Sequence, residues 1–329
     1  METHRIIRRQ VTVGGSLRKV WAVPEVGILI PLVLFTALFF VINPAFLSPN
    51  NIGAMLRATS FVGIIAIGQT FLMIAGELDL SVGSVAGLCA IAGSWLMKNG
   101  GWSAGAGAMA GLLTGGLVGL INGLVVVRLG LPAFIGTLGM LYIARGLVYL
   151  ITSGYPIYPL PASLKAFGAA DILGTSWSFV IFVVLVIIAD FVLRRTVFGR
   201  MVCATGGNKE VARIAGINTD LVKISCFSLI GMLSGLGGFL LMSRIAVGQP
   251  EIGVGWELDV IAGVVIGGVS LFGGIGTVAG TFIGLLVMQI VRSGLVISGV
   301  STHWQTVAVG VIMIIAVGVD LLRRRAKTS

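Results

Sequence analysis

The segment Phe198–Asn218, FGRMVCATGGNKEVARIAGIN, is polar and basic in a chain whose other long stretches are almost continuously apolar. Its charged side chains are Arg200, Lys209, Glu210 and Arg213, whereas only 10% of the whole chain is charged. Asn208 is a typical helix N-cap and Gly216 a typical residue after a helix end, which predicts a short helix between them. Gly206 and Gly207 are expected to form a tight turn with positive φ angles. Such an interruption is expected to lie in water and to contact another molecule.

The composition is that of a polytopic membrane protein. The 329 residues are 57% hydrophobic with a mean hydropathy of +1.06, whereas soluble domains average about 45–50% apolar and about 25% charged residues. The 49 glycines fit this class, because small residues let transmembrane helices pack closely. The net charge of +10 does not indicate nucleic-acid binding, because the basic residues gather at both termini and in the central segment, as they do when they flank membrane spans.

Ten apolar stretches approach the roughly 20 residues that a membrane-spanning helix needs. We therefore predict an all-α, polytopic integral membrane protein with about ten transmembrane helices, at 26–43, 60–76, 82–97, 104–127, 133–152, 178–193, 221–246, 257–272, 277–298 and 304–321. Helices next to Gly76 and Gly273 are expected to be broken or re-entrant. The predicted organisation is a cytoplasmic tail over 1–25, one transmembrane domain over 26–322 that contains the segment 198–218, and a basic cytoplasmic tail over 323–329.

The basic residues also predict the orientation. Cytoplasmic loops carry an excess of Lys and Arg, which places both termini and residues 194–220 inside and the loop 153–177 outside. Most tryptophans then fall at the outer ends of predicted spans, as in an interfacial aromatic belt.

Two Gly-rich segments resemble one another. GELDLSVGSVAG at 76–87 is similar to GGVSLFGGIGTVAG at 267–280. One interpretation is an internal repeat, because interrupted segments in corresponding halves of a transporter often lie near the translocation path. The other is chance similarity between two stretches rich in Gly, Val and Ala.

The sequence contains no motif that indicates catalysis. It has no GxxxxGK[ST] phosphate loop, no HExxH and no GxSxG, and its three cysteines lack metal-ligand spacing. We expect a protein that is not an enzyme and that holds no cofactor or metal itself.

Five carboxylates stand out. Glu77 and Asp79 adjoin long apolar runs, where a carboxylate serves either a transport path or the start of the following helix. No Lys or Arg lies near them in the sequence. Glu251, Glu257 and Asp259 lie on the predicted outer side, where they form either a docking patch for an extracytoplasmic partner or simply the acidic start of a helix.

Four motifs resemble one family. GELDLSVGS, ATGGNKEVARIAGIN, GWELDVIAGVVIGGVSLFGGIGTVAGT and VDLLRRR, in this order, are similar to the ribose/xylose/arabinose-type permeases of bacterial ABC importers, and the likeness spans about 28–325. The resemblance implies a pore of two ten-helix subunits in the bacterial inner membrane, a periplasmic sugar-binding protein, and a cytoplasmic ATPase, often a tandem domain, that binds ATP and Mg. The first motif departs from a more usual GxIDLS-like pattern, which adds Glu77. The family's coupling helix carries over onto Gly206, Gly207, Asn208, Glu210, Arg213 and Gly216.

We therefore expect a homodimeric transport subunit that moves a monosaccharide or small polyol and is driven by ATP hydrolysis in a separate protein. Glu210 and Arg213, three residues apart, would share the helix face that contacts the ATPase. Candidate path residues are Gln69, Thr70, Glu77, Asp79, Ser81, Ser84 and Asn122. The alternative is an ion-coupled secondary transporter that uses Glu77 and Asp79. The sequence does not identify the sugar.

Overall fold

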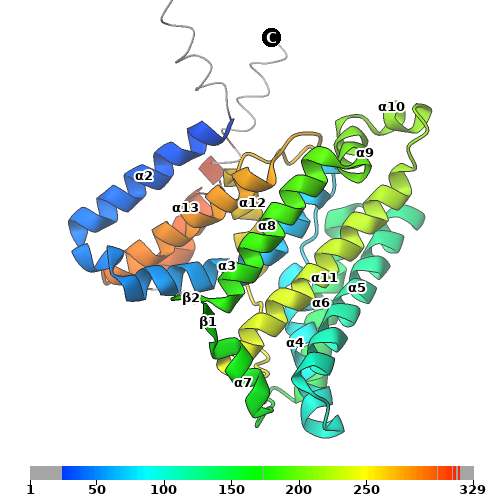
Figure 1. Ribbon diagram of the computed structural model, residues 1–329. Coiled ribbons are helices and arrows are strands. Elements are labelled where there is room, and N and C mark those ends of the chain that lie inside the picture. The colour runs from blue at the N-terminus through cyan, green and yellow to red at the C-terminus, as the bar shows by residue number, and fades with distance from the viewer. Residues whose placement is uncertain (1–23, 173, 302, 313, 316–317, 319–329) are drawn as a thin grey trace, which may run out of the picture.

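A computed structural model describes residues 24–318 apart from 173, 302, 313, 316 and 317, and the predicted tails 1–25 and 323–329 lie almost wholly outside this range. The chain is almost entirely helical (Figure 1). The helices are α2 (Pro24–Ile42), the short 3₁₀ helix η1 (Pro44–Leu47), α3 (Pro49–Ile74), α4 (Val82–Gly100), α5 (Ala104–Arg128), α6 (Ala133–Thr152), α7 (Ala162–Ala169), α8 (Trp177–Arg195), α9 (Val197–Gly207), α10 (Lys209–Ile214), α11 (Thr219–Ile245), α12 (Trp256–Ile266) and α13 (Val278–Ile297). Residues 303–312 are also helical. Strands β1 (Asp171–Ile172) and β2 (Thr175–Ser176) form a small antiparallel hairpin.

Six helices of the described part are long and apolar enough to cross a membrane, namely α3, α5, α6, α8, α11 and α13. The all-α membrane fold is therefore as predicted. The other four predicted spans correspond to α2, α4, α12 and the helical residues 303–312, so the total of about ten stays an expectation. The span expected at 60–76 starts too late, because α3 already begins at Pro49 with Ser48 as its N-cap.

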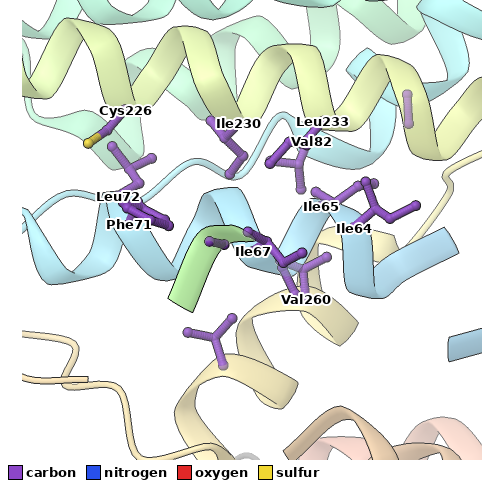
Figure 2. Close-up of a cluster of buried hydrophobic side chains, with 14 of the residues drawn as sticks. Ile64, Ile65, Ile67, Phe71, Leu72, Val82, Cys226, Ile230, Leu233 and Val260 are labelled. Atoms are coloured by element: carbon purple, nitrogen blue, oxygen red, sulfur yellow. The ribbon is translucent and has the colours of Figure 1, made fainter. Parts of the chain in front are cut away.

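The core of the molecule surrounds α3. Figure 2 shows α3 side chains directed both toward α11, where Ile230 and Leu233 lie, and toward Val260 of α12. Ile64 and Leu72 of α3 are fully buried. Because α3 is mostly apolar and most of its length is enclosed by other helices, it forms the centre of the bundle.

Helices α5 and α11 pack through glycines. Gly115 and Gly231 face one another so closely that a Cβ added to either would lie 2.1 Å from the carbonyl oxygen of the other. Gly235 approaches the Gly111 carbonyl in the same way, one turn along. The four-residue spacing of these glycines explains the close approach of the two backbones, as is usual for transmembrane helices.

Glycines mark two irregular segments, one in the link between the predicted spans 60–76 and 82–97 and one inside the predicted span 257–272, and we call both places the interrupted spans. Helix α3 ends at Ile74, Gly76 has φ +84°, and α4 begins only at Val82. Helix α12 covers only 256–266, and an irregular segment over 267–277, with Gly273 at φ +87°, separates it from α13. The continuous span expected at 257–272 is thus wrong in length, because Gly268, Gly273 and Gly274 take left-handed conformations that end the helix.

The two ends of the bundle differ. Figure 1 shows α9 and α10 at one end and α7 with the β1–β2 hairpin at the opposite end. This arrangement agrees with the expectation that residues 194–220 and the loop 153–177 lie on opposite sides of a membrane. Which end faces the cytoplasm stays a prediction.

Candidate functional site

The polar segment 198–218 forms two helices, α9 and α10, separated by Asn208. The Asn208 side chain accepts hydrogen bonds from the backbone N–H groups of Glu210 and Val211, both at 3.0 Å. Gly216 has φ +82°, and its N–H donates to the carbonyl of Arg213 at 3.0 Å. The predicted N-cap and helix stop are therefore both confirmed.

The expected conformation of Gly206 and Gly207 is wrong. Both belong to α9, and neither has a positive φ angle, because the helix continues to the cap at Asn208. The need for glycine at 206 is steric instead. A Cβ there would lie 1.8 Å from the carbonyl oxygen of Ile74, whereas a Cβ at 207 would meet no atom within 4 Å.

Gly206 belongs to a junction of three chain segments, which we call the glycine junction: Gly76, Gly206, Gly207, Gly273 and Gly274. The N–H of Gly274 donates to the carbonyl of Ile74 at 2.8 Å. A Cβ at Gly273 would lie 2.8 Å from the Gly206 carbonyl and 3.0 Å from Gly76 Cα. The end of α9 therefore contacts both interrupted spans, and these contain the two similar sequences at 76–87 and 267–280.

Helix α10 presents an exposed surface beyond this junction. Glu210 is exposed, and Val211 and Ile214 are 59% and 88% exposed. The Arg213 guanidinium donates to Asp220 at 2.8 Å and to Thr219 at 3.0 Å, so it ties α10 to the start of α11. Sequence reasoning assigned Arg213 to a partner surface together with Glu210. That role remains a prediction, and the structure adds an internal role for Arg213.

Glu77 has a cationic partner that the sequence did not reveal. The Lys223 ammonium, 146 residues away on α11, forms an ion pair with the Glu77 carboxylate. The two side chains are only 11% and 16% exposed. Local sequence offers no signal for this pair beyond the presence of a lysine near the start of an apolar span.

Three further path candidates form a buried polar cluster at the start of α4. Asp79 accepts hydrogen bonds from the backbone N–H and the hydroxyl of Ser81, at 2.7 and 2.6 Å. The Asn122 amide of α5 donates to Asp79 at 3.2 Å and to Ser81 at 3.0 Å. Asp79, Ser81 and Asn122 are thus brought together, and their bonds fix the entry into α4 and its contact with α5.

The remaining path candidates are also enclosed. The hydroxyls of Thr70 and Thr281 are 2.7 Å apart across α3 and α13, and Ser84 is buried. Gln69 is fully buried, and its amide nitrogen and oxygen have no hydrogen-bond partner among the described residues. A buried, unpaired amide is costly. Among the path candidates, Gln69 therefore leaves both polar atoms of its amide unused, and the side-chain oxygen of Asn122 is unpaired as well.

The three acids of the predicted docking patch do not share one environment. Glu251 is exposed, Glu257 is partly buried near Gly83, and Asp259 forms an ion pair with Arg292 of α13. Arg145 of α6 donates to the carbonyls of Pro250 and Ile252, at 2.7 and 3.2 Å, and so fixes the chain before these acids. Docking by these residues remains a prediction.

A bundle of apolar helices with two interrupted spans and a polar segment at one end defines a polytopic membrane protein of the transporter type. Residues 51–317 match the family described as branched-chain amino acid transport system / permease component, and the chain belongs to this family. The part of the chain that the structure describes contains no group of three or more His, Cys, Asp or Glu side chains suited to a metal.

Relatives place the chain among the sugar permeases of ABC importers. It is 36% identical to the L-arabinose ABC transporter permease protein of Azospirillum brasilense, over 92% of this chain and 88% of the relative. It is 37% identical to the ribose import permease protein of Bacillus subtilis, over 95% and 96%. It is 31% identical to the xylose transport system permease protein of Escherichia coli K12, over 92% and 93%. No solved structure matches the chain significantly.

Proposed function

We propose that this chain is the membrane-spanning subunit of an importer that moves a monosaccharide or a related small polyol across the bacterial inner membrane, driven by ATP hydrolysis in a separate subunit. The relatives named for arabinose, ribose and xylose transport support the solute class. The absence of a phosphate-loop motif from the sequence supports a separate ATPase, which would bind ATP and Mg.

One observation carries the coupling mechanism: the end of α9 packs against both interrupted spans at the glycine junction, while α10 leaves Glu210, Val211 and Ile214 exposed. A cytoplasmic ATPase that binds α10 would displace α9, and α9 in turn would move Ile74 and the 267–277 segment. Because these residues are glycines, the backbones contact one another directly. No flexible side chain lies between them that could change its conformation in place of the backbone.

The proposed assembly has further parts. A second copy of the chain would complete the pore. A periplasmic sugar-binding protein would dock at the end that carries α7 and the exposed Glu251. Both chain termini would lie in the cytoplasm together with α9 and α10.

Reconstitution tests this function. The chain is incorporated into liposomes together with its ATPase and binding-protein partners, and uptake of radiolabelled monosaccharides, both neutral and carboxylated, is measured with MgATP, with a non-hydrolysable analogue and without nucleotide. We expect uptake only with MgATP. The chain alone, under an imposed proton or sodium gradient, is the control. Substantial uptake in that control would overturn the ATP-driven mechanism.

The ion-coupled alternative receives no support from the carboxylates it needs. Glu77 is held by Lys223, and Asp79 accepts hydrogen bonds from Ser81 and Asn122. Both carboxylates are thus already bound by protein groups in a way that suits a structural role.

A further inference from the structure

A cavity of about 360 Å³ lies between α3, α11, α12 and α13, and a smaller one adjoins it. Its volume falls within the roughly 300–1,000 Å³ of small-molecule sites. Its lining includes the polar side chains of Arg57, Arg244, Asp259, Gln289 and Arg292, together with the indole of Trp256. None of the seven path candidates from the sequence lines this cavity. It is therefore a separate site.

The cavity has an excess of positive charge. It contains three guanidinium groups and one carboxylate, and the ion pair between Arg292 and Asp259 neutralises only one of the three. Arg57 and Arg244 form no ion pair with any residue in the described part of the chain. Arg57 is half-buried inside α3, where an ionisable group is costly unless it faces a polar cavity, whereas Arg244 is exposed in the last turn of α11, at the rim of the cavity. Two unpaired arginines on different helices therefore point to an anionic ligand.

The other lining groups fit a polyhydroxylated ligand. Gln289 offers an amide donor and an amide acceptor, whereas the side chains of Asp259 and Arg292 bind one another. Trp256 supplies a flat apolar surface beside them. Arginine binds carboxylates through two parallel hydrogen bonds, a geometry that hydroxyl groups alone do not use.

We propose that this cavity binds the transported solute, and that the solute is a monosaccharide-sized, hydroxyl-rich compound that carries a carboxylate. Arg57 and Arg244 would bind the carboxylate, and Gln289 with the Asp259–Arg292 pair would bind hydroxyl groups. This proposal rests on the proposed function, because it names the class of solute that the permease carries.

Thiol labelling tests the charge preference of the cavity without requiring transport. Gln289→Cys is introduced into the purified full chain, and its labelling rates are measured with an anionic sulfonate and a cationic trimethylammonium methanethiosulfonate of similar size. Tyr155→Cys, at an exposed loop position outside the cavity, is the matched control. Relative to that control, we expect the anionic reagent to be favoured about tenfold at position 289. Galacturonate should slow this labelling more strongly than galactose does.

Charge variants connect the preference to the two arginines. Arg57→Gln with Arg244→Gln should reduce the anionic preference to that of the control, and Arg57→Lys with Arg244→Lys should retain it. If the double glutamine variant fails to fold, the double lysine variant decides the question. It must still be labelled faster by the anionic reagent, and loss of that preference overturns the proposal. Equal labelling by both reagents in the parent protein overturns it as well.

Two further outcomes identify a different occupant. In nanodiscs, protection by phosphatidylglycerol but not by galacturonate would assign the cavity to a lipid headgroup and overturn the proposal. ATP-driven uptake of a neutral pentose, with galacturonate neither protective nor transported, would overturn this inference and leave the proposed function standing. Failure of all ATP-driven uptake, with galacturonate protection intact, would overturn the proposed function and would show that the cavity binds a carboxylated sugar that the chain does not transport.

Discussion

The glycine junction makes a sharp prediction for Gly206. In Gly206→Ala the new Cβ would lie 1.8 Å from the Ile74 carbonyl oxygen, about 1.6 Å short of an ordinary contact of 3.4 Å. The displaced carbonyl currently accepts the Gly274 N–H at 2.8 Å, so the clash also weakens that hydrogen bond. Overpacking of this kind costs about 1–3 kcal/mol, and a lost backbone hydrogen bond about 1 kcal/mol. We expect a destabilisation of about 2–4 kcal/mol.

The neighbouring glycine provides a matched control. A Cβ at Gly207 meets no atom within 4 Å, so Gly207→Ala should be neutral or slightly stabilising. Thermal unfolding of both variants in detergent, followed by size-exclusion chromatography, measures stability. The number of ATP molecules hydrolysed per solute transported in the reconstituted complex measures coupling. Gly206→Ala should lower the midpoint of unfolding and raise that ratio, and Gly207→Ala should change neither.

Equal behaviour of the two alanine variants would refute this reasoning. The Cβ at position 206 would clash with the Ile74 carbonyl, whereas the Cβ at position 207 would meet no atom within 4 Å. A Gly206→Ala protein of normal stability and normal coupling would show that the junction is loose. In that case α9 would not be the element that moves the two interrupted spans.

Three other changes test separate parts of the structure. Glu77→Gln leaves the nearly buried Lys223 ammonium without its carboxylate and should destabilise the protein by about 2–4 kcal/mol. Adding Lys223→Met should restore most of the lost thermal unfolding temperature. A Glu77→Gln protein as stable as the parent would contradict the ion pair. Gly115→Leu should abolish the α5–α11 contact and greatly reduce the yield of folded protein in chromatography, whereas Gly139→Leu, where a Cβ meets no atom within 4 Å, should be tolerated. Asn208→Ala removes two N-cap hydrogen bonds and should cost about 1 kcal/mol of local stability, seen as faster amide exchange in α10; unchanged exchange would contradict the cap.

Local signals in the sequence predicted the local structure well. Asn208 and Gly216 mark the two ends of α10, and they were predictable because capping depends on the backbone of only the next few residues. The apolar runs predicted the long helices, since a membrane-spanning helix satisfies its own backbone hydrogen bonds. The interruptions after α3 and α12 were also predictable, because glycines at Gly76 and Gly273 take left-handed conformations that no helix continues through.

Contacts between distant segments were not predictable. Lys223 and Glu77 are 146 residues apart, and an apolar stretch with one lysine does not reveal which carboxylate it meets. Gly206 was assigned a turn because glycine often permits positive φ, yet here the missing side chain serves a close approach to Ile74. Arg57 and Arg292 are single charges in apolar helices, and only their shared cavity shows that they belong together.

The two similar sequences acquire a common physical role from the junction. Gly76 begins one and Gly273 lies within the other, and both approach the same residue, Gly206. Motion of α10 reaches them only if the link between α9 and α10 is stiff. The Asn208 cap stiffens that link, and the Arg213–Asp220 ion pair ties α10 to α11. Under the proposed coupling, α11, which packs closely on α5, would hold the far side of α10, and a force applied to α10 would be directed through α9 toward the two interrupted spans.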